Sequence, residues 1–305
     1  MTPDAINAAP RSGLARLFHG QRAAIFIMLP PALMLFSVFV AWPFIDAAYY
    51  SVFKWNGFGT PTEFVGLANY EMILHHDVFF RSVLNALIIL VSSLAIQLPF
   101  SLAMALLIYR KTPTNSLFRL IFFLPYIIAE LASGLIWGFM FDGDTGLAAV
   151  ITSALHTDPF FLLTDRTWAF FGIVLVVMWK YFGFHMMIYV AALQGVPDEL
   201  VEAARIEGAN RWQIVLKVLI PMIKPAIAVS VFFAIVGSLQ LFDVVIPLTN
   251  GGPSNTTHTI VTYLYTFGLT RMRIGFGSAV GVILFAAAFT VSIVYQRSLA
   301  RRAAR

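Results

Sequence analysis

The chain has 305 residues, of which 59% are hydrophobic and 11% are charged, and its formal net charge is +5. Soluble domains contain roughly 45–50% apolar and roughly 25% charged residues, so the composition excludes a single water-soluble globule and indicates a membrane protein. The chain has no cysteine, which excludes a disulfide framework, a thiolate metal site and a cysteine nucleophile.

Six segments are long and apolar enough to cross a bilayer, whose ~30 Å hydrocarbon core requires about 20 mostly apolar residues. In chain order, the predicted spans are about 23–48, 82–109, 120–141, 167–193, 225–248 and 274–296. We expect the second span to bend at Pro99. The sequence therefore predicts an all-α, polytopic membrane protein, with a transmembrane domain over 23–297 and short tails at 1–22 and 298–305.

The distribution of basic residues predicts the topology, because Lys and Arg near membrane spans are retained on the cytoplasmic side. With both termini inside, the inner segments hold 14 of the 20 basic residues and the outer loops hold 5, with Lys180 inside a span. The inner residues are Arg11, Arg16, Arg22, Arg110, Lys111, Arg119, Arg205, Arg211, Lys217, Lys224, Arg297, Arg301, Arg302 and Arg305. We therefore expect both termini in the cytoplasm. Because these residues are spread over four segments, they favour topology signals and anionic-lipid contacts over nucleic-acid binding.

The outer connection 142–166 is acidic, with Asp142, Asp144, Asp158 and Asp165. The spacing of its first two acids lacks the remaining ligands and the closing Glu of a calcium loop. We expect a solvated acidic loop.

A charged stretch at 196–221 separates the fourth and fifth spans and lies on the cytoplasmic side in this topology. Pro197 and Asp198 indicate a helix start, and Gly208 can supply the left-handed residue that ends a helix. The predicted helix is Asp198–Glu207, in which Leu200, Ala203, Ala204 and Glu207 share one face. The two alanines leave this face shallow enough for a partner to approach closely.

A second short helix, Arg211–Ile220, is expected after Gly208, and Pro221 should stop or kink it before the fifth span. The pair of helices favours docking to a cytoplasmic partner. The alternative is an amphipathic loop that lies on the lipid headgroups.

The sequence Glu202-Ala203-Ala204, followed by Gly208 and then by Val218-Leu219-Ile220-Pro221, resembles the Glu-Ala-Ala loop of the membrane subunits of binding-protein-dependent ABC importers. Three further segments resemble the carbohydrate-uptake branch of that family. They are Phe122–Pro125, Ala192–Pro197 and Leu248–Pro253. The resemblance extends over about residues 20–300.

This resemblance implies a permease in the bacterial inner membrane. In the family, two permease subunits form the pathway, an extracytoplasmic binding protein delivers the solute, and two cytoplasmic ATPases each receive one such loop. By this resemblance, the ATPase-coupling residues are Glu202, Ala203, Ala204, Gly208 and Pro221. The resemblance also implies a second permease that forms a heterodimer with this chain.

The ATPase itself is expected to be another chain. No Gly-Lys pair occurs in the sequence, so the phosphate loop of the form Gly-x4-Gly-Lys-Ser/Thr is absent. We therefore expect no catalytic residue and no cofactor in this chain, and ATP to be used by the partner ATPases.

Polar side chains within the spans are candidates for the substrate pathway, because such groups are costly in lipid and usually face the bundle interior or a wet path. The candidates are Asn85, Gln97, Glu130, Lys180, His185, Gln240 and Asp243. The alternatives are hydrogen bonds between helices for the amides, an ion pair between Glu130 and Lys180, and simple packing for His185.

The sequence leaves other functions open. Glu130, Lys180 and Asp243 would also suit a secondary transporter driven by an ion gradient, and a membrane scaffold or receptor without transport is a third hypothesis. Within the same branch, a glycerol-phosphate or polyol permease is an alternative to a sugar permease.

Overall fold

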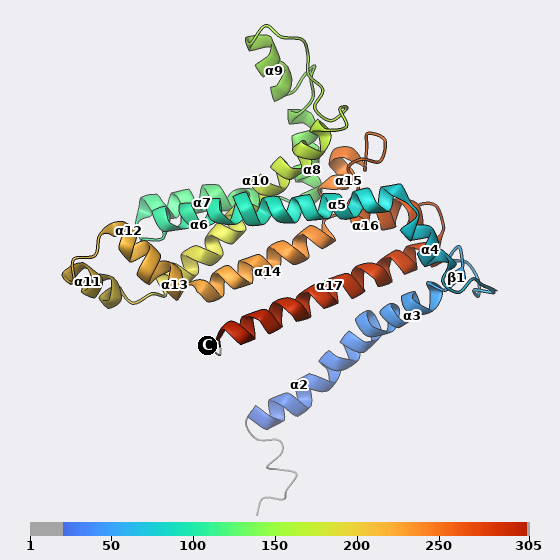
Figure 1. Ribbon diagram of the computed structural model, residues 1–305, viewed down its shortest axis with the longest axis horizontal. Coiled ribbons are helices and arrows are strands. Elements are labelled where there is room, and N and C mark those ends of the chain that lie inside the picture. Colours follow the sequence, from blue (N-terminus) through green and yellow to red (C-terminus); the bar gives the residue numbers. More distant parts are fainter. Residues whose placement is uncertain (1–20, 304–305) are drawn as a thin grey trace, which may run out of the picture.

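The protein is almost entirely helical in a computed structural model, which describes residues 21–303. Most of the predicted tail 1–22 and the last two residues, with Arg11, Arg16 and Arg305, lie outside the described residues. Several long helices run along one axis of the molecule, with α11 at one end and β1 at the other (Figure 1).

The first half of the chain contains α2 (Gln21–Phe36), the π-helical turn η1 (Ser37–Ala41), α3 (Trp42–Tyr50), strands β1 (Phe53–Lys54) and β2 (Glu63–Phe64), α4 (Ala68–Leu74), α5 (Asp77–Ser92), the π turn η2 (Ser93–Gln97), α6 (Leu98–Ile108), α7 (Pro113–Ile127), α8 (Glu130–Met140) and α9 (Leu147–Ala154). The second half contains α10 (Trp168–Gln194), α11 (Asp198–Ile206), α12 (Arg211–Ile214), η3 (Val215–Leu219), α13 (Ile220–Met222), α14 (Lys224–Gln240), α15 (Val245–Thr249), α16 (Ile260–Tyr263), η4 (Leu264–Leu269) and α17 (Ile274–Ala303).

Four continuous helical segments are long and apolar enough to cross a membrane. They are Ile27–Tyr50, Asp77–Ile108, Trp168–Gln194 and Ile274–Arg301. The number rises to six when each of two bent helix pairs counts as one span: α7 with α8, bent by 95°, and the run Arg211–Met222 with α14, bent by 67°. The chain is therefore an all-α, polytopic membrane protein, as the sequence predicts.

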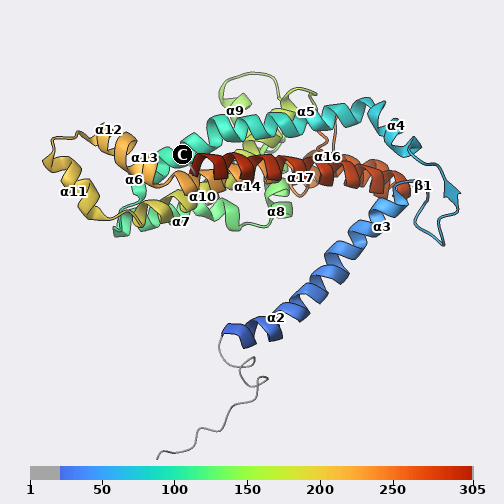
Figure 2. The same cartoon turned by 60° about the horizontal axis from the view of Figure 1, so that its bottom comes forward.

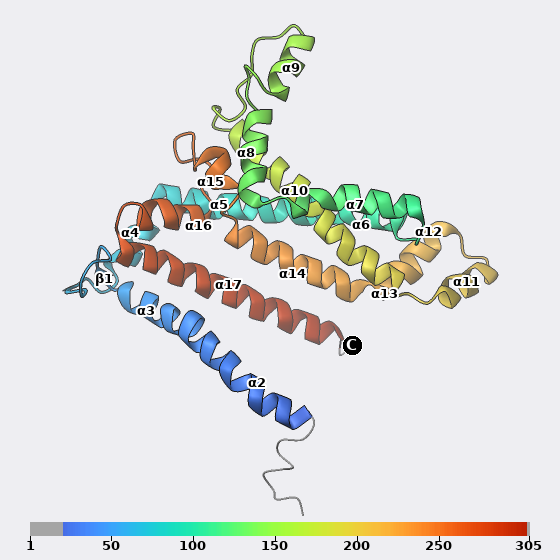
Figure 3. The same ribbon diagram turned by 180° about the vertical axis from the view of Figure 1, so that it is seen from behind.

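The third predicted span, 120–141, is divided in the structure. Pro125 removes one backbone donor from the last turn of α7, and Ile128 and Ala129 then adopt extended ψ angles of 134° and 139°. Helix α8 consequently leaves the bundle sideways and carries α9 away from it (Figure 3).

The fifth predicted span, 225–248, ends early as a helix. Helix α14 stops at Gln240, because Leu241 takes a ψ of 119°. The carbonyl oxygen of Leu241, which this break leaves without a helical donor, accepts a 2.5 Å hydrogen bond from the hydroxyl of Thr259. In the second span, where the sequence predicts a bend at Pro99, the helix runs continuously over Asp77–Ile108, and the π turn η2 joins α5 to α6 two residues before that proline.

Small residues bring the central helices into close contact, as is usual where lipid supplies no hydrophobic drive for packing between helices. A Cβ atom at Gly183 of α10 would collide with the backbone carbonyl of Phe122 in α7. A Cβ at Gly134 of α8 would likewise collide with the ring of Pro247 in α15. The first contact places α10 against α7, and the second places α15 against α8.

The amino-terminal helix leaves the rest of the molecule. Helix α3 packs against α17, but α2 diverges from it, and the two helices separate steadily toward residue 21 (Figures 1 and 2). No residue in the most apolar part of Ile27–Tyr50 is buried within the chain. Lipid or another protein must therefore cover this helix.

Candidate functional site

The loop between α10 and α14 has the helix–glycine–helix form that the sequence predicts. Helix α11 spans Asp198–Ile206, and Gly208 follows it with a φ of +83°. The amide of Gly208 donates to the Arg205 carbonyl at 3.0 Å, and the amide of Ala209 donates to the Ala204 carbonyl at 2.9 Å. This pair of bonds is the Schellman C-cap, which requires a left-handed residue at the glycine position.

A capping box then starts the second helix of the loop. The Asn210 side chain accepts from the Gln213 amide at 2.9 Å, and the Gln213 side chain accepts from the Asn210 amide at 2.8 Å. The helical run does not stop at Pro221, which lies inside α13, and it breaks two residues later at Ile223. Pro221 thus lies near the end of a continuous helical run, directly after the π turn η3.

The exposed face of α11 differs from the face predicted from the sequence. Ala203 is exposed, whereas Ala204 is half-buried against the core cluster that includes Leu193 and Ile214. The outermost apolar side chain is Ile206, which is 88% exposed. The sequence analysis missed Ile206, although its spacing of three and four residues from Ala203 and Glu202 places it on their face.

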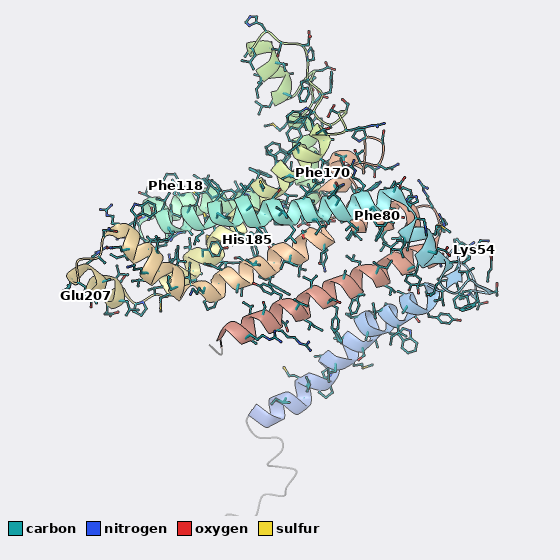
Figure 4. All side chains as sticks on the ribbon, in the orientation of Figure 1. Lys54, Phe80, Phe118, Phe170, His185 and Glu207 are labelled. Atoms are coloured by element: carbon teal, nitrogen blue, oxygen red, sulfur yellow. The ribbon has the colours of Figure 1, made fainter. Side chains whose placement is uncertain are left out.

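This loop lies at one end of the molecule. Figure 4 shows Glu207 and Lys54 at opposite ends of the long axis. The α6–α7 connection with its basic residues and the carboxyl-terminal end of α17 lie toward the Glu207 end (Figure 2). The exposed loop and these basic segments therefore share one side.

Five of the seven polar residues predicted for the pathway line one cavity of about 440 Å³. These residues are Gln97, Glu130, His185, Gln240 and Asp243. The walls come from α5 with η2, the α7–α8 break, α10 and α14, and Figure 4 shows His185 on α10 in this part of the bundle. Helices that are far apart in sequence thus bring most of the predicted polar groups together.

Glu130 is the centre of the polar contacts in the cavity. The hydroxyl of Tyr181 donates to Glu130 Oε1 at 3.0 Å, and the Asp243 carboxyl lines the same cavity near enough for its charge to interact with that of Glu130. Gln97 is buried, and its amide nitrogen lies 3.5 Å from the Val177 carbonyl oxygen. The buried His185 has no partner for Nδ1 among residues 21–303. The cavity can therefore offer several hydrogen-bond acceptors to a polar solute.

Lys180 lies outside the cavity wall and has no ion pair with Glu130 among the described residues. Its Nζ donates to the carbonyl oxygens of Ile128, at 2.5 Å, and Pro125, at 3.4 Å, and to Ser133 Oγ at 3.3 Å. The carbonyls belong to the last turn of α7 and to its break, where helical donors are missing. The ammonium group thus stabilises the break.

Asn85 also has a structural role in this arrangement. Its side-chain nitrogen donates to the carbonyl oxygens of Thr256 and His258, each at 2.8 Å. These bonds attach the connection between α15 and α16 to the middle of α5. Asn85 therefore joins two segments and does not line the cavity.

Comparison with known proteins agrees with this architecture. Residues 97–305 match the protein family described as "Binding-protein-dependent transport system inner membrane component". This chain belongs to that family. Two relatives align with most of this chain. The "Probable starch degradation products transport system permease protein AmyD" of Thermoanaerobacterium thermosulfurigenes is 33% identical over 88% of the chain and 91% of the relative. The sn-glycerol-3-phosphate transport system permease protein UgpA of Agrobacterium fabrum is 28% identical over 91% and 94%.

The permease fold also matches a solved structure. The crystal structure of a bacterial ABC transporter that imports the acidic polysaccharide alginate aligns with a TM-score of 0.81 at 24% identity, over 92% of this chain and 96% of that one. The protein is thus a multi-pass permease subunit of a binding-protein-dependent importer, related to carbohydrate-uptake permeases, and it works with a solute-binding protein. The family favours this function over a secondary transporter driven by an ion gradient.

Proposed function

We propose that this permease is one of two that form the pathway of an ATP-driven importer for a sugar or a related polyhydroxylated solute. The solute comes from an extracytoplasmic binding protein, and the energy comes from two copies of a separate cytoplasmic ATPase. The chain binds no cofactor itself. The observation that carries the proposal is the exposed α11–Gly208–α12 loop, which extends from the membrane-spanning helices at the end rich in basic residues (Figure 2).

The loop supports coupling because it is both exposed and stiff. Glu202, Ala203 and Ile206 are exposed on α11, while the Schellman cap and the capping box fix the turn on either side of Ala209. Half-buried Val201 and Ala204 pack against the core cluster that includes Leu193. A force on the exposed face would therefore pass directly to α10 and α14. With the loop in the cytoplasm, both chain termini are cytoplasmic, which agrees with the positive-inside rule.

The second permease is supported by the amino-terminal helix. Helix α2 extends away from the molecule with its apolar side chains exposed (Figure 1). A related subunit beside α3 and α17 would cover this helix on one side, and lipid would cover the rest.

The substrate class is supported by the cavity and by the relatives. Carboxylates, amides and an imidazole alternate in its wall with aromatic rings such as Tyr126 and Phe184, which stack with centroids 4.8 Å apart. Hydroxyl groups of a sugar can bond to the polar groups, and the ring faces can cover its apolar surface. AmyD is named for starch degradation products and the solved neighbour for alginate.

The proposal is tested at Gly208 with two substitutions. Nothing lies within 4 Å of a Cβ atom at this glycine, but its φ of +83° is strained for other residues. Asn tolerates the left-handed conformation, whereas a β-branched residue does not. We expect Gly208→Val to insert normally and to lose uptake of the cognate solute into proteoliposomes, with Gly208→Asn retaining most of it.

The same preparations provide the control measurements. The complex should copurify with an ATPase that carries a phosphate loop, and uptake should require ATP. Normal uptake by Gly208→Val would remove the coupling role of the loop. Uptake without ATP that collapses with an ion gradient would overturn the ATP-driven function.

A further inference from the structure

The cavity wall has an uneven charge. Among the described residues that line it, Glu130 and Asp243 are the carboxyl groups, and no Lys or Arg is present. The other polar groups are amides, hydroxyls and the imidazole of His185. A solute in this cavity therefore meets two acidic groups and no permanently cationic one.

The two carboxyl groups act at the same place. Glu130 opens α8 directly after the break in the third span, and Asp243 lies in the irregular segment after α14. Both side chains line the same cavity, near enough for their charges to interact, and Tyr181 donates to Glu130 at 3.0 Å. The break between α7 and α8 and the break after α14 thus each place one carboxyl group in the wall of this cavity.

The nearest lysine, Lys180, interacts with the charge of Glu130 but offers no hydrogen bond to a solute at the wall. Lys180 is 1% exposed, and its Nζ bonds to the carbonyl oxygens of Pro125 and Ile128 and to Ser133 Oγ. All three hydrogens of an ammonium group are used by three such acceptors. Lys180 therefore has no donor left for a phosphate, sulfonate or carboxylate in the cavity.

An anionic solute would be poorly held in such a site. Phosphate and carboxylate groups are bound in proteins by Arg, Lys and backbone donors, and like charges repel strongly where water is scarce. Hydroxyl groups, in contrast, can donate directly to carboxylate oxygens. The family does not decide the matter, because UgpA is named for sn-glycerol-3-phosphate, which is an anion, and AmyD for starch degradation products.

We propose that the Glu130–Asp243 carboxyl pair makes this cavity selective for uncharged polyhydroxylated solutes and excludes anionic ones. The proposal rests on the proposed function for its substrate class, since it names the charge of the solute that the importer carries. In this proposal, the side chains of Glu130 and Asp243 contact the solute directly and determine whether a neutral or an anionic solute is accepted.

The first test measures the charge selectivity of the cavity without any substrate. Because the chain lacks cysteine, Gly237→Cys would place a single thiol in this chain. Gly237 lines the cavity, and a Cβ atom there meets nothing within 4 Å. The probes are the trimethylammonioethyl and sulfonatoethyl methanethiosulfonates, which carry opposite charges. Each reacts with the thiolate to form a mixed disulfide and release methanesulfinate.

The complex would be labelled in nanodiscs at pH 8, where an ordinary imidazole with a pKa of about 6.5 is neutral. Mass spectrometry of this chain gives the two rates. For the thiol in the cavity, we expect the ratio of the cationic to the anionic reaction rate to be about 10-fold larger than the same ratio on free cysteine. This factor corresponds to about 1.4 kcal/mol. Adding Glu130→Gln and Asp243→Asn should return the ratio to that of free cysteine. Glu71→Gln, an exposed acid in α4, should leave it unchanged.

The second test measures transport. The intact complex with its binding protein would be offered neutral oligosaccharides and polyols, and separately uronate oligosaccharides and glycerol phosphate. Uptake of neutral solutes alone supports the proposal. Uptake of an anion by the wild-type complex overturns it. So does a ratio of labelling rates that stays the same when Glu130 and Asp243 are replaced. If no solute of either kind is carried, the proposed import function fails, whereas the thiol ratio still reports the charge of the cavity.

Discussion

The Nζ atom of Lys180 lies 2.5 Å from the carbonyl oxygen of Ile128, at the point where the third predicted span breaks. A buried lysine in the middle of a membrane protein thereby compensates for helical hydrogen bonds that the break removes. The same break directs Glu130 into the cavity beside Tyr181. The lysine thus supports the wall of the cavity without lining it.

Replacing Lys180 should weaken the fold more than it alters substrate contacts. Lys180→Met would leave the carbonyls of Ile128 and Pro125 without a donor, and a hydrogen bond to a charged group contributes about 1.5–3 kcal/mol. We expect a loss of about 2 kcal/mol or more in stability, seen as a lower melting temperature of the purified complex. Lys180→Arg keeps the charge and the donors and should recover part of the loss. A Met variant as stable as the wild type would contradict the assigned role.

Asn85 gives a second test of a structural amide in the membrane. Asn85→Leu removes both 2.8 Å bonds to the carbonyls of Thr256 and His258. Because each unsatisfied buried group costs about 1–3 kcal/mol, we expect a lower melting temperature and faster proteolysis between α15 and α16. Uptake by the surviving folded protein should keep the wild-type KM, and a large change in KM would show that Asn85 meets substrate.

Ile206 should contribute directly to ATPase binding. The side chain is 88% exposed on a cytoplasmic helix in the proposed topology, and burying an isoleucine against a partner is worth about 1.5–3 kcal/mol. We therefore expect Ile206→Asp to weaken the affinity for the ATPase by about 10–100-fold, as measured by titration of the ATPase onto permease in nanodiscs. Ile206→Leu serves as the matched control and should bind normally. Equal affinity of all three proteins would place the contact on another face of α11.

The local features of the α11–Gly208–α12 loop were predictable because neighbours in sequence determine them. A glycine three residues after Arg205 gives the C-cap, and Asn210 with Gln213 gives the next helix start. The break at Ile128 was not predictable, because its stabilising partner lies 52 residues away on α10. The cost of polar groups in lipid correctly indicated that Asn85 and Lys180 face inward. It could not tell bonds to backbone carbonyls from contacts with a solute.

The last prediction concerns pH and His258, in the connection between α15 and α16. The side chain is fully buried. Burial, with a smaller effect of Arg271, lowers the pKa of His258 from 6.5 to about 4. Its ring contacts the Thr262 hydroxyl through Nδ1 at 3.2 Å and Asn255 Oδ1 through Nε2 at 3.3 Å, and the Phe267 ring lies 5.8 Å away. These neighbours accommodate the neutral ring.

Because the folded pKa lies below the unfolded one, the unfolded chain binds more protons between pH 6.5 and about 4. The contribution of His258 to stability is therefore complete above pH 6.5 and declines as the pH falls through this window. We expect the melting temperature of the purified permease to fall from pH 7 to pH 5. The His258→Gln variant cannot titrate at this position, so it should be less stable at pH 7 and should show a smaller fall. An identical pH dependence in both proteins would show that other groups cause it.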